Sequence, residues 1–260
     1  MNKLGLGLLT GFILFFSISA KAQEFEESSS DHDELPYYFG LTFGYNNSFL
    51  HTLRNPNFYN SSNSFRHVEP KGSGGIELGL MGTLKLADHW ELRTVPKLII
   101  GGSKSLTYYY KNGMEPAGAT INTSTDGVGG YAETIKLPQT TVSVPIHVKF
   151  SSDRIGNIRG YIFGGPKYEI NLSGNGEEYT KDRELSGNQS YQAPQFRKGS
   201  FGMEGGLGVH IYLPFAVISP EIRMSTSLQN DHLRDVGNPY SAAFGGMSQR
   251  MLSFSINIEQ

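Results

Sequence analysis

Hydrophobic and polar side chains alternate along most of this chain. In the first such segment, Tyr37, Phe39 and Leu41 fall on one side of an extended chain, whereas Tyr38 and Gly40 fall on the other. A period of two is typical of β-strands that have one face against an apolar environment. The sequence predicts eight such strands, over residues 37–46, 74–86, 90–110, 142–150, 157–172, 201–211, 216–228 and 252–258.

The connections between these segments alternate in length. Three are short, at residues 87–89, 151–156 and 213–215, whereas four are long and polar, at residues 47–73, 111–131, 173–197 and 229–247. Short periplasmic turns and long extracellular loops are typical of bacterial outer-membrane barrels. The predicted fold class is therefore all-β: a transmembrane eight-stranded antiparallel up-and-down β-barrel in the cell outer membrane, with both termini periplasmic.

The strands of a soluble barrel also alternate between apolar and polar residues, so alternation alone does not identify a membrane barrel. The composition of the polar face favours the membrane barrel. This face mixes Gly and Ser with full charges, and small residues suit the narrow lumen of eight strands. Aromatic residues gather near the strand ends, at two levels, as in interfacial girdles. These are Tyr37, Trp90, Tyr212 and Phe215 at one end, and Tyr108, Tyr109, Tyr110, Tyr131 and Tyr168 at the other.

Four prolines, Pro96, Pro145, Pro166 and Pro220, fall inside predicted strands. Each proline removes a hydrogen-bond donor, and a closed barrel has no free edge at which that loss is harmless. We therefore expect bulges or strand ends at these four positions.

The N-terminal region reads as three successive parts. Residues 1–22 combine Lys3, an apolar stretch and Ala20-Lys21-Ala22, which is the pattern of a signal peptide with its cleavage site. Residues 23–36 are acidic and are predicted to form a flexible periplasmic tail. The barrel domain is predicted to occupy residues 37–260.

Composition excludes several other classes of protein. The chain has no cysteine, which excludes a disulfide framework and thiolate metal sites. A net charge of −2 gives no indication of nucleic-acid binding. After the signal, no apolar run approaches the length of a membrane-spanning helix. No cofactor is predicted.

Opposite charges occur on the polar faces of neighbouring predicted strands. Unpaired charges inside a barrel are costly, so these side chains should pair across strands. We interpret them as a salt-bridge plug that seals the lumen, with a proton or ion pathway as the alternative. The network is assigned to Glu77, Arg93, Lys97, Glu204, Glu221 and Arg223.

No catalytic or metal site is predicted. None of the seven histidines has the spacing H-x-x-x-H or H-E-x-x-H. His147 and His210 lie on the polar face, where a histidine could activate a serine hydroxyl. A lipid-modifying barrel enzyme thus stays open, as the least favoured of the alternatives.

Several short segments follow one another in order within residues 37–260: Glu69-Pro70-Lys71, Gly79-Leu80-Met81-Gly82-Thr83, Ser152-Asp153-Arg154-Ile155-Gly156-Asn157, Gly164-Gly165-Pro166-Lys167-Tyr168, Ser219-Pro220-Glu221-Ile222-Arg223 and Ser248-Gln249-Arg250-Met251. Together they resemble the PorT-type outer-membrane barrels of the Bacteroidetes type IX secretion and gliding apparatus. The resemblance implies a non-enzymatic barrel that helps a secretion system assemble or work. It implies membrane lipid and other secretion-system proteins as partners, and it supplies no catalytic residues.

Two segments are candidates for a partner contact. The first is the predicted periplasmic turn, with Ser152, Asp153, Arg154 and Asn157, for which an ordinary hairpin is the alternative interpretation. The second is a loop base with Glu69 and Lys71, for which a role in strand entry is the alternative. A general porin-like or structural barrel stays open as the second choice of function.

Overall fold

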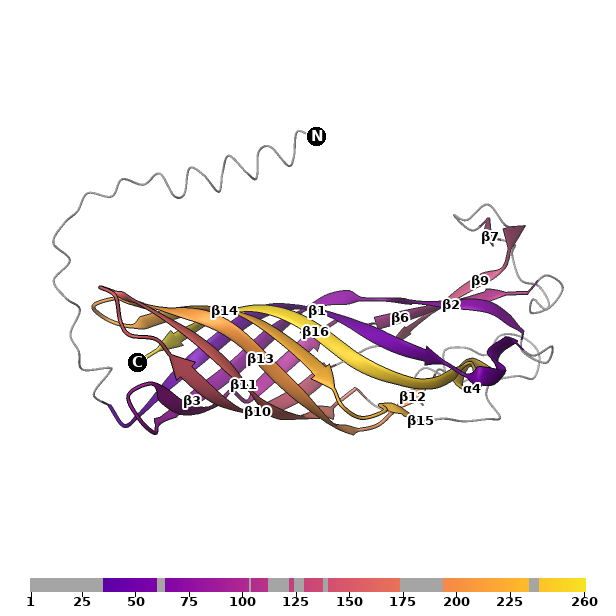
Figure 1. The fold of residues 1–260 in the computed structure, drawn as a ribbon. Coiled ribbons are helices and arrows are strands. Elements are labelled where there is room, and N and C mark those ends of the chain that lie inside the picture. Colours follow the sequence, from indigo (N-terminus) through magenta and orange to yellow (C-terminus); the bar gives the residue numbers. More distant parts are fainter. Residues whose placement is uncertain are drawn as a thin grey trace, which may run out of the picture.

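Long β-strands dominate the computed structural model, which describes residues 35–59, 64–102, 104–111, 122–123, 129–137, 140–173, 194–233 and 239–260 (Figure 1). The predicted signal peptide and nearly all of the acidic tail lie outside these residues. In the described residues, no helix is long and apolar enough to cross a membrane. The elements are β1 (Tyr37–Arg54), a 3₁₀ turn (Pro56–Tyr59), β2 (Phe65–Lys71), β3 (Ser73–Lys85), β4 (Trp90–Thr94), β5 (Lys97–Gly101), β6 (Lys104–Tyr110), β7 (Asn122–Thr123), β8 (Gly129–Gly130), β9 (Ala132–Leu137), β10 (Thr140–Ser151), β11 (Ile158–Asn171), β12 (Gln195–Phe196), β13 (Gly199–Tyr212), β14 (Val217–Ser227), β15 (His232–Leu233), α4 (Pro239–Ala242) and β16 (Phe244–Glu259).

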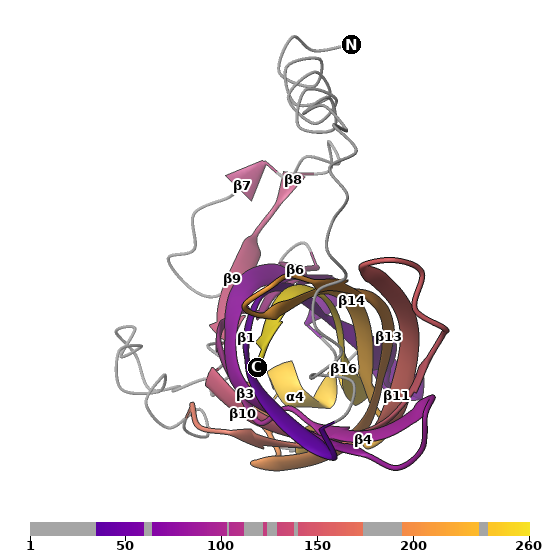
Figure 2. The same cartoon turned by 90° about the vertical axis from the view of Figure 1, so that its left-hand side faces the viewer.

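The main sheet closes into a ring (Figure 2). Its order is β1-β16-β14-β13-β11-β10-β4-β3, and β1 also pairs with β3. β5 continues β4, because both pair with β3 and β10 in a single register. Every pairing in the ring is antiparallel. Each joins strands that follow one another along the chain, except β1–β16, which joins the first strand to the last and closes the ring. This confirms the predicted eight-stranded up-and-down barrel.

Apolar side chains face outward from the ring and polar side chains face inward. On β16, the outward residues Phe254 and Ile256 are 51% and 41% exposed, whereas Ser253, Ser255 and Asn257 between them are buried. The other ring strands show the same alternation. This arrangement is the reverse of a soluble barrel and fits a ring surrounded by lipid.

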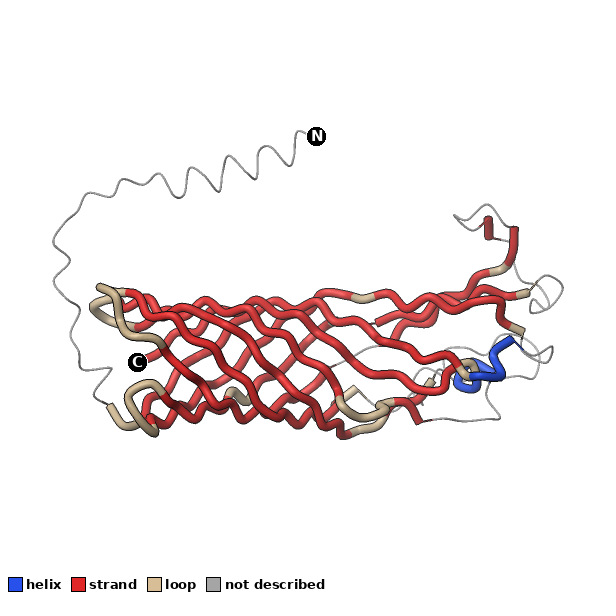
Figure 3. The backbone as a smooth tube through the Cα atoms, in the orientation of Figure 1, coloured by secondary structure: helices blue, strands red, loops and turns tan. Residues whose placement is uncertain are grey.

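The two ends of the barrel differ as the sequence predicts. Three short connections, β3–β4, β10–β11 and β13–β14, lie at the end where the chain terminates (Figure 3). We call this the short-turn end and the opposite one the loop end. The predicted loops at residues 111–131 and 173–197 fall largely outside the described residues.

The other two predicted loops are wrong over part of their length. Residues 47–54 belong to β1, residues 65–71 form β2, and β16 begins at Phe244. β2, β6 and β9 build a three-stranded sheet that projects beyond the ring at the loop end (Figure 1). Polar residues mark this region in the sequence, but hydrogen-bonded strands can continue into water as long as one face is covered.

The four strand prolines interrupt ladders without shifting the register. Pro166 lies in a gap between β10 and β11 that Pro145 borders, and Pro220 lies in a gap between β13 and β14. Pro96 separates β4 from β5, a strand-end position as expected. The expected bulges are wrong at the other three, because the pairs on either side of each gap keep the same alignment.

A second packed region lies at the loop end, beyond the ring's apolar belt. Its buried side chains come from β1, the 3₁₀ turn, β2, β6, β9, α4, β16 and the residue between α4 and β16. We call it the loop-end cluster: Leu50, Phe58, Phe65, Val68, Leu106, Tyr108, Tyr110, Ile135, Leu137, Tyr240, Ala243, Phe244 and Met247. Tyr108 and Tyr110 therefore pack inside the protein, and the prediction that they face the membrane interface is wrong. Tyr212 is likewise buried, under Arg154.

Candidate functional site in the barrel lumen

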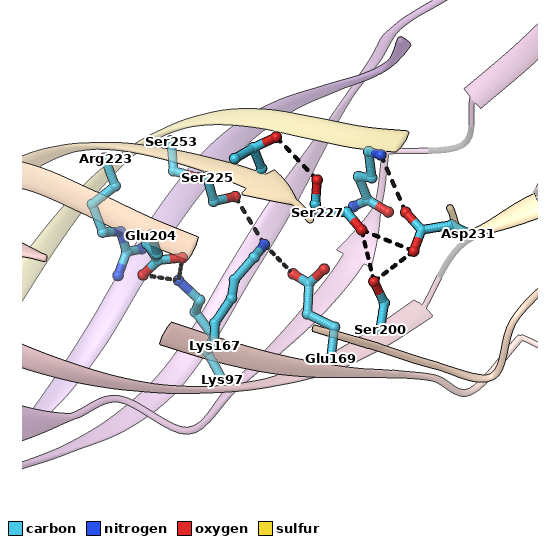
Figure 4. Close-up of polar contacts among 12 residues, drawn as sticks. Lys97, Lys167, Glu169, Ser200, Glu204, Arg223, Ser225, Ser227, Asp231 and Ser253 are labelled. Carbon is cyan, nitrogen blue, oxygen red and sulfur yellow. Dashed lines mark hydrogen bonds and ion pairs between the residues drawn. The ribbon is translucent and has the colours of Figure 1, made fainter. Parts of the chain in front are cut away.

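A chain of ion pairs crosses the middle of the lumen. Lys97 on β5 places its Nζ atom 2.8 Å from both carboxylate oxygens of Glu204 on β13. The same Nζ lies 3.7 Å from Glu77 on β3. Glu77 also accepts hydrogen bonds from Arg223 at 2.5 Å and from Ser253 at 2.6 Å. Figure 4 shows the side chains of Lys97, Glu204 and Arg223 close together between the strands.

A second ion pair lies beside this chain. Arg93 on β4 donates to the carboxylate of Glu221 on β14, which also accepts a hydrogen bond of 2.7 Å from Tyr161. The guanidinium of Arg93 stacks over Phe163, with 4.3 Å between Cζ and the ring centroid. The structure thus brings all six residues of the sequence-predicted network into the lumen, each in at least one ion pair.

Two further layers lie on either side of this centre. Toward the short-turn end, Lys149 lies 2.7 Å from Glu91, and Tyr38 donates to the same carboxylate at 2.7 Å. Toward the loop end, Lys167 lies 2.6 Å from Glu169 and donates to Ser225. The interior of an eight-stranded barrel is only wide enough for side chains, so these layers fill its cross-section.

The hydrogen-bond partners of these charges are harder to see in the sequence. Tyr38, Tyr161, Ser253 and Glu259 all take part, although none belongs to the predicted network. The signal available for them is strand parity, because each falls on the inward face of its strand.

The two lumen histidines do not form a nucleophilic site. His147 lies 3.3 Å from Glu204 within the central chain and is fully buried. The Nδ1 atom of His210 lies 2.7 Å from Ser219, which donates to Glu259. The Glu259 carboxylate thus accepts the serine hydroxyl and also lies 3.6 Å from His210 Nδ1, and Ser219 is fully buried and inaccessible to a substrate. Over the residues that the structure describes, no group of His, Asp and Glu could hold a metal ion.

The candidate contact turn between β10 and β11 has both structural and exposed members. Arg154 donates to Gly156 O at 2.8 Å and to Asn157 Oδ1 at 3.3 Å, and it stacks on Tyr212. The hydroxyl of Ser152 donates to Asp153 O and accepts from the Gly160 amide. These contacts fix the turn. The side chain of Asp153 is 93% exposed, with His89 of the neighbouring turn 3.8 Å away.

The second candidate segment lies at the opposite end of the molecule. Glu69 and Lys71 are exposed on β2, in the sheet that projects from the loop end. Glu69 accepts a hydrogen bond of 3.3 Å from Tyr109 on β6. The structure therefore separates this segment from the β10–β11 turn by the length of the barrel, and the two cannot contact one partner site.

Comparison with known proteins gives one family and several distant structural likenesses. Residues 21–232 match the family described as outer membrane protein beta-barrel domain. Solved structures that resemble this chain include the outer membrane protein OprG from Pseudomonas aeruginosa, at 12% identity, with 86% of this chain and 93% of that one covered and a TM-score of 0.46. Neisserial surface protein A matches at 9% identity, with 85% and 96% covered and a TM-score of 0.37. Ail, the attachment invasion locus protein of Yersinia pestis, matches at 6% identity, with 87% and 100% covered and a TM-score of 0.33. No curated protein sequence gives a match.

Proposed function

This chain belongs to the outer membrane protein beta-barrel domain family, and we propose that it is a sealed barrel that assists a type IX protein secretion machinery through contacts with other proteins. The observation that carries the proposal is the filled lumen. Ion pairs such as Lys97–Glu204 and Arg93–Glu221 join strands on opposite sides of the ring. A barrel closed in this way acts through its ends, because its bore offers solutes no open path.

The secretion role rests on the order of segments that resemble PorT-type barrels. Two of them, the turn at residues 152–157 and the strand at residues 219–223, contribute to the short-turn end and to the lumen network respectively. A sealed lumen is consistent with an accessory part of a secretion machinery. The runner-up is a general porin-like or structural barrel, and a conducting lumen would favour its porin-like form.

The contact surface that we propose lies at the short-turn end, the end that faces the periplasm in outer-membrane barrels. Asp153 and Ile155 project from the β10–β11 turn, and Phe215 projects from the β13–β14 turn, with Ile155 83% and Phe215 75% exposed. Arg154 and Ser152 act within the turn and hold its shape. Asp153 is therefore the cleanest position at which to test a partner contact.

Secretion in a deletion strain is the decisive test of the function. We expect the strain that lacks this gene to lose export of type IX cargo, and the wild-type gene to restore it. Asp153→Ala should reduce the rescue, whereas Asp88→Ala, on the next turn and equally exposed at 94%, should rescue fully. Heat-modifiable gel migration would report that both variants assemble. Normal cargo export in the deletion strain would refute the secretion role.

Conductance separates the proposal from its porin-like alternative. The purified full chain, inserted in planar lipid bilayers, should give no stable conductance steps above those of protein-free detergent controls. Ohmic steps in the wild-type protein would overturn the sealed barrel in favour of a pore. A lipid-modifying activity that is lost in His210→Ala while the barrel remains assembled would support the enzyme instead.

A further inference from the structure

A small cavity lies at the loop end of the lumen, above the layer formed by Lys167 and Glu169. Its volume is about 50 Å³, several times the ~10–15 Å³ that one water molecule requires. Five of its lining residues, Thr141, Glu169, Ser200, Asp231 and Gln249, come from the inner side of the ring or from just above it. We call this cavity the vestibule, and Glu169 in its lining is bonded to Lys167, which donates to Ser225 on the side toward the centre of the lumen (Figure 4).

Three cations and two acids line this vestibule, and both acids already have partners within the barrel. Glu169 is paired with Lys167 at 2.6 Å. Asp231 accepts hydrogen bonds from the Ser200 hydroxyl at 2.5 Å, from the Ser227 hydroxyl at 2.9 Å and from the backbone N–H of Gln249 at 3.2 Å (Figure 4). Both acids also lie near Lys104, but the lining still carries three cations against two acids.

The cations are Lys104 on β6, with Arg197 and Lys198 just before β13. Lys104 is 3% exposed, whereas Arg197 and Lys198 are exposed to solvent. Lys104 faces Glu169, Asp231 and Lys167, and its burial lowers its pKa to about 7 even though the two acids act in the opposite direction. An anion in the vestibule would favour the charged form of this lysine.

We propose that the vestibule binds a small soluble oxyanion, a phosphate or a carboxylate group, through Lys104 and Arg197, with the amide side chains of Asn171 and Gln249 as neutral donors. The space matches one such group. The ligand is a solute and not a membrane lipid, because lining residues such as Thr141 and Glu169 lie on the inward face of ring strands, away from the bilayer. This inference does not depend on the secretion role.

Binding is measured on the purified full chain in phosphatidylcholine nanodiscs, by calorimetric titration with inorganic phosphate at constant ionic strength. We expect saturable binding to one site. Charge-assisted hydrogen bonds contribute about 1.5–3 kcal/mol, so Lys104→Gln should weaken binding about 10-fold or more, and Arg197→Gln should weaken it severalfold. Arg250→Gln is the matched control, because Arg250 follows Gln249 on β16 but is exposed on the outward face. The phosphate affinity of this variant should equal that of the wild type.

Inorganic sulfate, which keeps its charge through the neutral range, tests the role of Lys104. Sulfate affinity should fall as the pH rises above about 7, with proton uptake on binding, and this dependence should vanish in Lys104→Gln. If Lys104→Gln does not assemble, the proposal is still tested by the phosphate affinity of Arg197→Gln and by the pH dependence of sulfate binding to the wild type.

Three results would overturn the proposal. The first is the absence of saturable phosphate and sulfate binding by the wild type, which would make the vestibule a water-filled space. The second is an equal loss in Arg250→Gln, which would indicate nonspecific attraction to the loop end. The third is competition with phosphate when phosphatidic acid is added to the nanodiscs, which would identify a lipid headgroup as the ligand.

Discussion

The lumen and the loop-end cluster are built by some of the same strands but bury opposite kinds of side chain. In the lumen, the inward face of β16 carries Ser253, Ser255 and Asn257. Farther along the same strand, Met247 and Phe244 are buried in the loop-end cluster. The difference follows from the surroundings of the strand. Lipid takes up the apolar face in the membrane and leaves polar groups for the interior, whereas in water the apolar face has to be covered by protein.

The largest effect should come from removing one partner of a lumen ion pair. Arg93→Met leaves the Glu221 carboxylate buried without its guanidinium, which costs about 3–5 kcal/mol. The double variant Arg93→Met, Glu221→Met removes both charges and should recover most of that loss. Urea-dependent folding into phospholipid vesicles measures both. A double variant as unstable as the single one would contradict the view that pairing, and not polarity itself, is what the lumen requires.

Reversing the polarity of the lipid face should have the next largest effect. Leu78, outward on β3, is 42% exposed, and Leu78→Arg should cost about 2–4 kcal/mol in the same folding assay. Leu53 is 59% exposed on the loop-end part of β1, and Leu53→Arg should change stability by only about 0.5 kcal/mol. Equal losses for the two variants would mean that the membrane extends to the loop-end cluster.

A loss confined to the loop-end cluster should follow from Tyr240→Phe. The Tyr240 hydroxyl donates to Glu133 at 2.6 Å and lies 2.7 Å from the Tyr110 hydroxyl, so its removal should cost about 1–3 kcal/mol. Hydrogen exchange should show lower protection in β6 and β9 with unchanged protection in the ring. Tyr37→Phe, at an exposed tyrosine of the short-turn end, serves as the control. Equal loss of protection throughout the barrel would show that the two regions form one cooperative unit.

The smallest effect per side chain concerns the alkaline stability of the same cluster. Burial raises the pKa of Tyr108, Tyr110 and Tyr240 above the usual value near 10. Because the unfolded tyrosines lose their protons first, the cluster should lose stability as the pH rises above about 10, by less than about 1.4 kcal/mol per tyrosine over the first pH unit. Hydrogen exchange in β6 against pH, with Tyr240→Phe for comparison, measures this loss. Constant protection would contradict it.

Strand parity in the sequence was sufficient to predict which residues enter the lumen. The inward positions of Glu77, Lys97 and Glu204 follow directly from alternation with Leu78, Leu98 and Met203. Strand parity did not predict which acidic and basic side chains form ion pairs with each other. The partners Arg93 and Glu221 are on strands that do not pair, and they meet because the tilt and stagger of the closed ring bring them to one level of the axis.

The loop end was predicted less well, for a related reason. A period of two reports that one face of a strand is covered, but it does not report whether lipid or protein covers it. Tyr108 and Tyr110 therefore read as membrane-facing, although β2, β9 and α4 enclose them. The vestibule was also hidden, because Lys104, Arg197 and Asp231 belong to segments that appear in the sequence as parts of separate strands and loops.

The ladder between β1 and β16 has a consequence for how this protein is made. It joins the first strand to the last, from Gly40 and Glu259 to Leu53 and Gly246 without a shift in register. A nascent chain that lacks its final strand leaves the unpaired edges of β1 and β14 exposed to hydrocarbon, where each unsatisfied peptide group costs several kcal/mol. Insertion thus depends on synthesis of the whole polypeptide, and truncated products should remain outside the bilayer, open to proteolysis.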